Sequence, residues 1–433
     1  MDAALLYTYF LKHPAISTDT RNIQPNSLFF ALKGENFNGN AFAAEALEKG
    51  ASYAIIDEPQ YRKDEHYLLV TDVLTMLQEL ARYHRARLQI PVIGITGTNG
   101  KTTTKELIHA VLSQQFTAYA TKGNLNNHIG VPLTVLSITG QTEVAIIEMG
   151  ANHVGEIAFL CGIAEPTHGL ITNVGKAHLE GFGSFEGVKK AKGELYDYLA
   201  THDGTLFLQQ DNPLLREMAA ARRVQEVVTY GFSVGNDVVG ELVSADPLLN
   251  VRWNTPGNTT TRTTHTQLTG SYNTENILAA VCIGRHFGVA PDKIDQGIAA
   301  YTPANNRSQL TKTEHNTLIR DYYNANASSM AAALENFNGL DADRKVIILG
   351  DMFEMGDESY EEHGKVVSQA LSMQASRILF VGKAFFQHRS PHAEFYETTE
   401  AAKDILVQQP IQDSLILLKA SRGMAFEKLT DTL

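Results

Sequence analysis

Two glycines, a lysine and a threonine follow an apolar run and could together hold a phosphate chain. They are Gly97, Gly100, Lys101 and Thr102. Where a strand turns into a helix, backbone N–H groups can surround phosphates, the lysine can reach the terminal ones, and the hydroxyl can bind Mg²⁺. Ile95 stands where the longer phosphate-binding pattern has its first glycine, so this is the shorter form. The motif favours nucleotide binding, and an ordinary strand-to-helix turn is the alternative.

Polar side chains also end several other apolar runs. Glu148 follows four apolar residues, and Asn173 ends the next such run. Asp321, Asp351 and the Ser-Arg-Gly sequence at 421–423 occupy similar places later in the chain. Ligands of parallel α/β sheets gather at the carboxyl ends of strands, where a carboxylate can bind Mg²⁺. The position of Glu148 therefore favours a functional role, with a solvated strand end as the alternative.

The elements that must position these groups alternate between strand and helix. Strands are predicted at 92–95, 144–148, 168–173, 317–321, 346–351, 377–382 and 415–421. Helical spacing is found at 71–87, 105–115, 273–286, 291–300 and 328–337. Such alternation is typical of an α/β fold with mostly parallel sheets and helices on both faces. Residues 236–269 are instead rich in Thr and Asn, which predicts a small β-hairpin annex.

Changes in this pattern predict three domains. Residues 1–88 have short strands at 27–32, 51–56 and 66–70, which indicates a small α/β unit. Residues 89–304 contain the phosphate-binding motif, and residues 305–433 read as a second doubly wound unit. A length of 433 residues agrees with roughly three domains at about 150 residues each.

The composition excludes several classes of protein. A formal net charge of −12 argues against nucleic acid as a partner, because polyanion binding depends on neutralising phosphates. No stretch approaches the roughly 18 apolar residues of a membrane span. The N-terminus lacks a basic region and a cleavage pattern, so we expect no secretory signal and no membrane association. Cys161 and Cys282 are expected to be reduced, buried thiols of a cytoplasmic monomer.

Five ordered motifs resemble those of the Mur ligases, the enzymes that build the stem peptide of peptidoglycan. The motifs lie at residues 97–103, 121–132, 148–151, 173–180 and 192–194. The resemblance covers essentially the whole chain. Within the family, residues 148–153, 178–183, 321–326 and 421–423 look like the branch that adds D-alanyl-D-alanine.

The resemblance implies an ATP-dependent amide ligase. It would join UDP-N-acetylmuramoyl-tripeptide to D-alanyl-D-alanine through an acyl phosphate, with ATP and two Mg²⁺ ions. The N-terminal domain would bind the UDP-sugar, the central domain would bind ATP, and the Rossmann-like C-terminal domain would close over both. Alternatives are the family ligase that adds the third stem-peptide residue, a folylpolyglutamate synthase, or a P-loop regulatory module without ligase activity.

The same resemblance implies roles for individual residues. The catalytic residues would be Lys101, Glu148, His178 and Lys192, with Lys192 carbamylated. The metal ligands would be Thr102, Glu148, His178 and the carbamate of Lys192. ATP would contact Gly97, Thr98, Asn99, Gly100, Lys101, Thr102, Thr103, Asn273, Asn276, Arg307, Asp321, Asn324 and Asn326. The substrates would contact Asp19, Arg21, Lys33, Asn38, Thr121, Asn126, Asn127, Ser421 and Arg422. By its position alone, Asn273 could also be a helix N-cap.

The chain departs from the family pattern in its C-terminal third. The unusual residues are Ser308-Gln309, Arg320, Ala327 and Ala420. None of them removes a phosphate-binding or metal-binding group, so the departures bear on the C-terminal contacts and on substrate preference.

Overall fold

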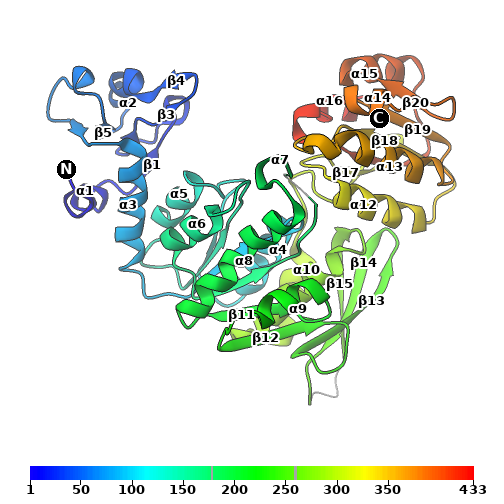
Figure 1. The fold of residues 1–433 in the computed structure, drawn as a ribbon, viewed down its shortest axis with the longest axis horizontal. Coiled ribbons are helices and arrows are strands. Elements are labelled where there is room, and N and C mark those ends of the chain that lie inside the picture. The colour runs from blue at the N-terminus through cyan, green and yellow to red at the C-terminus, as the bar shows by residue number, and fades with distance from the viewer. Residues whose placement is uncertain (177–178, 258–260) are drawn as a thin grey trace.

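The computed structural model describes residues 1–176, 179–257 and 261–433. Three main sheets follow one another along the chain, with four, nine and six strands. In Figure 1 the N-terminal sheet lies at the upper left, the central sheet below, and the C-terminal sheet at the upper right. The expected α/β fold with mostly parallel sheets is confirmed.

The N-terminal sheet is parallel and has the strand order β1-β2-β5-β6. Its strands are β1 (Ile16–Ser17), β2 (Leu28–Phe30), β5 (Tyr53–Ile56) and β6 (Tyr67–Leu69), and a separate pair is formed by β3 (Lys33–Gly34) and β4 (Phe37–Asn38). The helices are α1 (Ala3–Phe10), α2 (Ala43–Glu48) and α3 (Val73–Arg85). Asp72 starts α3 by accepting a hydrogen bond from the Thr75 N–H. The apolar face of α3 packs on two helices of the central unit, α5 (Gly130–Leu136) and α6 (Glu156–Ala164), so one hydrophobic core joins the first sheet to the central one.

The central sheet has the order β15-β14-β13-β12-β11-β10-β7-β9-β8. Its strands are β7 (Val92–Thr96), β8 (Ala118–Ala120), β9 (Val144–Glu148), β10 (His168–Ile171), β11 (Thr205–Gln209), β12 (Glu226–Gly231), β13 (Val238–Ala245), β14 (Leu248–Asn254) and β15 (Arg262–Thr269). The strands from β8 to β12 are parallel. The predicted hairpin proves larger, because three strands, β13 to β15, continue this sheet and pair antiparallel with one another.

Helices cover both faces of the central sheet. They are α4 (Lys101–Leu112), α5 (Gly130–Leu136), α6 (Glu156–Ala164), α7 (Leu179–Phe182), α8 (Phe185–Thr201), α9 (Pro213–Ala220), α10 (Asn273–His286) and α11 (Pro291–Ala300). The two helices predicted at 273–286 and 291–300 have the predicted bounds. One face is packed by α4, α10 and α11, and the other by α5, α6 and α8.

The C-terminal sheet has the order β16-β17-β21-β18-β19-β20 and is parallel except at its first pair. Its strands are β16 (Gln309–Lys312), β17 (Asn316–Asp321), β18 (Lys345–Gly350), β19 (Arg377–Val381), β20 (Glu394–Tyr396) and β21 (Ser414–Lys419). Its helices are α12 (Ala327–Gly339), α13 (Ser359–Leu371), α14 (Lys383–Phe386), α15 (Thr399–Gln408) and α16 (Glu427–Thr430). Separate hydrophobic clusters fill the two faces of this sheet, as in a doubly wound unit.

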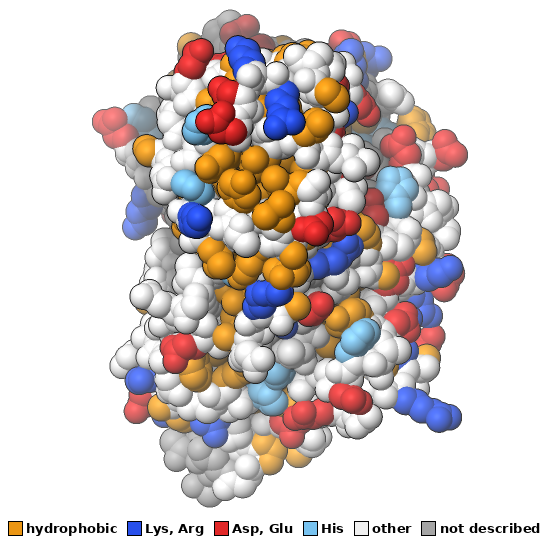
Figure 2. Space-filling view, turned by 90° about the vertical axis from the view of Figure 1, so that its left-hand side faces the viewer, with side chains coloured by type: hydrophobic (Ala, Val, Ile, Leu, Met, Phe, Trp, Pro, Cys, Tyr) orange, Lys and Arg blue, Asp and Glu red, His pale blue; other side chains and the backbone are white. Residues whose placement is uncertain are grey.

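The surface at the N-terminal end mixes apolar and charged side chains. Figure 2 shows hydrophobic side chains gathered in the middle of this face, with acidic and basic residues interspersed around them. Exposed apolar side chains at this end of the chain include Met1, Leu5 and Leu11, at and beside α1. Among the described residues, none of the helices has the length and hydropathy needed to cross a membrane. Both cysteines are buried and unpaired.

Candidate active site

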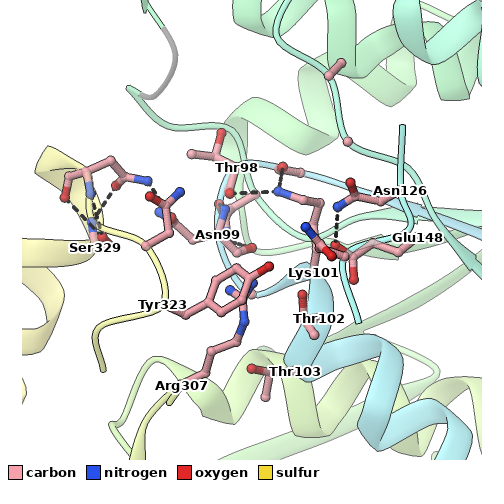
Figure 3. Close-up of a pocket in the computed structure, with 18 of the residues that line it drawn as sticks. Thr98, Asn99, Lys101, Thr102, Thr103, Asn126, Glu148, Arg307, Tyr323 and Ser329 are labelled. Atoms are coloured by element: carbon pink, nitrogen blue, oxygen red, sulfur yellow. Dashed lines mark hydrogen bonds between the residues drawn. The ribbon is translucent and has the colours of Figure 1, made fainter. Parts of the chain in front are cut away.

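A cleft of about 570 Å³ lies where the central and C-terminal sheets face each other. The loop between β7 and α4 forms its floor, and the carboxyl end of β9 and the start of α10 flank that loop. Residues between Arg307 and Ser329 approach from the C-terminal side, as Figure 3 shows for Arg307, Tyr323 and Ser329. The cleft is therefore assembled from segments far apart in sequence.

Two positions in the loop require glycine. Gly97 has a φ of +143°, and a Cβ there would lie 2.0 Å from the Thr172 hydroxyl. Gly100 has a φ of +79°, and its Cβ would lie 2.9 Å from the Asn276 Oδ1. Residues that carry a side chain rarely adopt such backbone conformations. The loop can thus pack tightly against neighbouring elements and begin α4 directly at Lys101.

Lys101 is folded back onto its own loop. Its Nζ donates to the carbonyls of Gly97 at 2.7 Å and Thr98 at 3.0 Å. Burial lowers the pKa of Lys101 to about 8, with Glu148 opposing this shift and Arg307 adding to it. Both charged neighbours lie around the same cleft, so the ammonium is ready to exchange loop carbonyls for the oxygens of an anion.

Glu148 ends β9 with a buried carboxylate, 1% exposed. Asn126 donates its Nδ2 to the Oε1 at 2.8 Å, and Figure 3 shows this contact beside Lys101 and Thr102. The Oε2 is buried and has no hydrogen-bond partner among the described residues. An unpaired buried carboxylate oxygen is costly unless a cation or a donor binds it. The carboxylate and the nearby Thr102 hydroxyl are hard oxygen donors, which fit Mg²⁺.

Thr121 does not line the cleft, contrary to the expectation that it contacts the substrate. Its side chain is buried, and its Oγ1 accepts a hydrogen bond from the Glu148 N–H at 3.0 Å. The Thr121 N–H donates to the carbonyl of Ile146 at 3.0 Å. Thr121 therefore fixes the backbone of β9, while Asn126 and Asn127 further along the same loop reach the cleft.

The asparagines of α10 pack against the phosphate-binding loop. Asn276 accepts a hydrogen bond from the Thr104 hydroxyl at 2.9 Å and donates to Asn273 at 2.8 Å. Asn273 donates to the carbonyl of Thr269 at 2.7 Å. Asn273 is the first residue of α10, and Tyr272 is the N-cap, so the N-cap role considered for Asn273 is wrong. Both asparagines line the cleft.

A pair of hydrogen bonds joins the loop directly to the C-terminal domain. Asn99 donates its Nδ2 to the Ser328 Oγ at 2.8 Å and accepts from the Asn326 Nδ2 at 2.8 Å. Asn326 is also the N-cap of α12, in a capping box with Ser329. We call these contacts of Asn99, Asn326 and Ser328 the clasp. The clasp connects the loop between β7 and α4 to the start of α12.

Cationic side chains and one aromatic ring form the C-terminal wall of the cleft. The Arg307 guanidinium lies 3.8 Å from the Tyr323 ring centre. Arg422, which was predicted to contact the substrates, does not line the cleft, although its guanidinium lies 5.4 Å from the same ring centre. Cations over aromatic faces are attracted to the ring. Asp321 accepts a hydrogen bond from the Lys419 Nζ at 2.6 Å and from the Ser308 N–H at 3.3 Å. The wall carries more positive than negative charge, which suits an anionic ligand.

Lys192 lies on α8 at the cleft and is 3% exposed. Among the described residues, the one hydrogen bond that its Nζ donates is long, 3.5 Å, to the carbonyl of Ala151; the Nζ also lies 5.3 Å from the Phe182 ring centre. Burial, together with the nearby Lys101, lowers the pKa of Lys192 to about 7, with Glu156 and Glu194 opposing this shift. Lys192 therefore loses its proton more readily than an exposed lysine does.

The structure brings most of the predicted site residues to one cleft. Those lining it are Gly97, Thr98, Asn99, Gly100, Lys101, Thr102, Thr103, Asn126, Asn127, Glu148, Lys192, Asn273, Asn276, Arg307, Asp321, Asn324 and Asn326. Asn173 lines it as well. His178 lies outside the described residues.

Other predicted residues lie elsewhere. Asp19 and Arg21 pair with each other in the N-terminal domain, while Lys33 pairs with Asp57 and Asn38 bonds to Glu58. Ser421 is buried, and its Oγ accepts a hydrogen bond from the Phe353 N–H at 3.0 Å. Asp351, interpreted as facing a ligand, instead accepts hydrogen bonds from the Ala384 and Phe385 N–H groups at the start of α14.

Several cleft residues were missed from the sequence. Tyr272, Tyr323, Ser328 and Lys419 line the cleft but were not predicted. Lys419 ends the apolar run of β21, which is the same signal that identified Glu148. The two tyrosines gave no comparable signal, because an aromatic residue beside a strand is usually part of the core.

Comparisons with known proteins agree along the whole chain. Models described as Mur ligase family, catalytic domain, Mur ligase middle domain, and Mur ligase, glutamate ligase domain match residues 14–85, 95–284 and 306–422. The UDP-N-acetylmuramoyl-tripeptide–D-alanyl-D-alanine ligase of Bacillus subtilis (strain 168) is 35% identical over 433 residues, covering 96% of this chain and 92% of that protein.

Solved structures give the same result. The crystal structure of MurF from Acinetobacter baumannii superposes with a TM-score of 0.86 at 29% identity, covering 99% of this chain and 98% of that chain. The MurF ligase from Thermotoga maritima, solved in complex with ADP, has a TM-score of 0.85 at 25% identity, covering 98% and 97% of the two chains.

Proposed function

Because the chain belongs to the Mur ligase family, we propose that it joins D-alanyl-D-alanine to UDP-N-acetylmuramoyl-tripeptide and converts ATP to ADP and phosphate. The observation that carries this proposal is the end-to-end similarity, 35% identity over 96% of the chain, to a relative named for that reaction. The product is a precursor of peptidoglycan. The same similarity disfavours a folylpolyglutamate synthase and the ligase of the third stem-peptide residue.

The reaction must first activate a carboxylate. Oxide is a poor leaving group, so the terminal carboxylate of the tripeptide attacks the γ-phosphorus of ATP, the bond to the bridging oxygen breaks, and ADP leaves. Such transfers depend on positioning and on charge neutralisation. Lys101 and the amides of residues 97–100 would hold the phosphates, and Arg307 would approach from the C-terminal wall. The cationic character of the cleft supports these roles.

Thr102 and Glu148 would hold a Mg²⁺ ion beside the ATP phosphates, with His178 and Lys192 near a second ion. When bound, these ions would neutralise the charge that develops on the transferred phosphoryl group. The unpaired buried oxygen of Glu148 supports this assignment. The amine of D-alanyl-D-alanine then attacks the acyl carbon, phosphate leaves with the acyl-oxygen bond electrons, and the amine loses a proton.

Lys192 would act as a carbamate, formed when its amine attacks CO₂ and releases a proton. Only a neutral amine carries out this attack, and the lowered pKa of Lys192, about 7, supplies that form. Within the described part of the chain, the buried Nζ makes one long hydrogen bond, to a carbonyl. A carbamate there would place next to Lys101 an anion that can bind metal.

The remaining assignments complete the proposal. The domains would be 1–88 for the UDP-sugar, 89–304 for ATP and 305–433 for closure. Asp19, Arg21, Lys33 and Asn38 would contact the UDP-sugar. Asn273 and Asn276 would approach the adenine, and Asp321, Asn324 and Asn326 the rest of ATP. Asn126, Asn127, Ser421 and Arg422 would face the peptide substrates.

A substrate-panel assay tests the function. Phosphate release and the mass of the product are measured with ATP, UDP-N-acetylmuramoyl-tripeptide and D-alanyl-D-alanine, each omitted in turn. We expect phosphate release only when all three are present. A regulatory module would bind ATP but form no amide product. The ligase of the third stem-peptide residue would instead join a single amino acid to UDP-N-acetylmuramoyl-dipeptide.

The carbamate has its own test. We expect Lys192→Ala to lose activity by at least about a hundredfold, because a ligand and a charge are removed, and to regain part of it with acetate or propionate. Lys190→Ala, on the same helix, is the control. Full activity of Lys192→Ala without added carboxylate would rule out the carbamate.

A further inference from the structure

We infer that Lys105 is a positioning residue that keeps the carboxylate of Glu148 in register with the phosphate-binding loop. The inference rests on the proposed function, in which Glu148 holds a metal ion. Lys105 lies on α4, four positions after Lys101, and its side chain is 0% exposed. It does not line the cleft, so any effect on the reaction must pass through other residues.

The surroundings of Lys105 do not explain a lysine by packing alone. Its Nζ donates to the carbonyl of Thr121 at 2.5 Å and lies 2.9 Å from the Glu106 Oε1. The Glu106 side chain is 33% exposed, so it offsets only part of the hydration that a buried ammonium loses. An apolar side chain of similar length would fill the same space without that desolvation cost.

The contacts of Lys105 lead directly to Glu148. Thr121 accepts at its carbonyl from Lys105 and at its Oγ1 from the Glu148 N–H, the latter at 3.0 Å. Thr121 also begins the loop that carries Asn126, whose Nδ2 binds the Glu148 Oε1 at 2.8 Å. Lys105 thus anchors both the backbone of Glu148 and the base of the loop that orients its carboxylate.

The anchor joins the two halves of the metal site. Lys101 and Thr102 start α4, and Lys105 fixes the same helix to β9 through Thr121. In the described part of the chain, α4 also packs on β9 through apolar side chains of one hydrophobic cluster, but apolar packing is not directional. Groups that orient metal ligands are commonly worth about ten- to a hundredfold in metal affinity.

The test measures metal binding separately from activity. Mn²⁺ is titrated into the protein with saturating ADP, and free Mn²⁺ is followed by its electron paramagnetic resonance signal. We expect Lys105→Met to weaken Mn²⁺ binding by about tenfold and to raise the Mg²⁺ concentration for half-maximal ligase rate similarly. The KM for the UDP-linked tripeptide should not change, because its binding does not involve this contact.

Two further variants separate positioning from folding. Thr121→Val keeps the carbonyl that Lys105 binds and removes only the acceptor of the Glu148 N–H, so it should weaken Mn²⁺ binding as well. Lys189→Met, which removes a lysine of α8 that pairs with Glu217 on α9, should bind Mn²⁺ normally. If Lys105→Met does not fold, normal Mn²⁺ binding by Thr121→Val still overturns the inference.

Normal Mn²⁺ binding by Lys105→Met, or by Thr121→Val, would overturn the inference even if thermal stability fell. A wild-type protein that binds Mn²⁺ and ADP but forms no amide would instead contradict the proposed function. The two failures are therefore distinguishable.

Discussion

Removing the clasp should open the molecule in the absence of nucleotide. The change is Asn99→Ala, which deletes one hydrogen bond given to Ser328 and one received from Asn326, both 2.8 Å long. Partly buried hydrogen bonds between neutral groups contribute about 0.5–1.5 kcal/mol each. Together they amount to roughly 1–3 kcal/mol, which is about a 5- to 150-fold change in the ratio of closed to open molecules.

The closed form should become less populated without disappearing, because other contacts span the same interface. The Ser271 N–H donates to Asn336 at 2.9 Å, the Tyr272 hydroxyl bonds to Ser308 at 2.9 Å, and Lys176 pairs with Glu358 at 2.9 Å. The prediction is therefore a shift in populations rather than complete separation of the domains.

The assay is single-molecule energy transfer between dyes on the N-terminal and C-terminal domains. Lys63→Cys and Gln408→Cys provide exposed attachment sites, and both native cysteines are buried. Ser329→Ala is the matched control, because it weakens the capping box of α12 without contacting Asn99. If Asn99→Ala and wild type give the same distribution of transfer efficiencies, the clasp does not hold the domains together.

Two further predictions concern stability and the loop. His168 is paired with His286, 3.3 Å between their Nε2 atoms, and burial, with His286 adding to it, lowers the pKa of His168 to about 4. The neutral form is thus favoured in the fold, so this contribution is complete above the unfolded pKa of about 6.5 and is lost as the pH falls toward 4. Urea unfolding should show wild type losing about 2 kcal/mol more than His168→Phe between pH 7 and pH 5; equal losses would contradict the shift. Gly97→Ala should weaken ADP binding by at least about tenfold, because its Cβ would lie 2.0 Å from the Thr172 hydroxyl, where the backbone also disfavours a side chain. Calorimetric titration checks this, with Gly140→Ala as control because a Cβ there meets no atom within 4 Å.

The sequence alone was sufficient to identify a site residue wherever that residue is part of a local sequence pattern. Gly97, Lys101 and Glu148 could be found because glycine conformation, helix start and strand end each leave a signal in the residues around them. The bounds of α10 and α11 could be predicted for the same reason: each begins at a polar residue or proline and has continuous apolar spacing.

The remaining features depend on which elements become neighbours. Thr121 follows an edge strand, and nothing local tells whether its hydroxyl meets a ligand or the Glu148 N–H. The partners of Asn99 come from residues more than two hundred positions away, at the start of α12. Similarly, β13 alternates only weakly, because much of it is exposed and its place is set by pairing with β12 and β14.

The position of Asn99 has a consequence for how nucleotide binding and domain closure are connected. Without nucleotide, polar groups of the loop form hydrogen bonds within the protein. Lys101 binds the carbonyls of Gly97 and Thr98, and Asn99 binds the C-terminal domain. Phosphates that attract Lys101 must draw it away from the carbonyls of Gly97 and Thr98, and these residues directly precede Asn99 in the same loop. A shift of the loop therefore changes the hydrogen bond between Asn99 and Asn326 at the start of α12. If the nucleotide favours the clasped geometry, the clasp must raise nucleotide affinity by the same factor, since the coupling between two binding events is reciprocal.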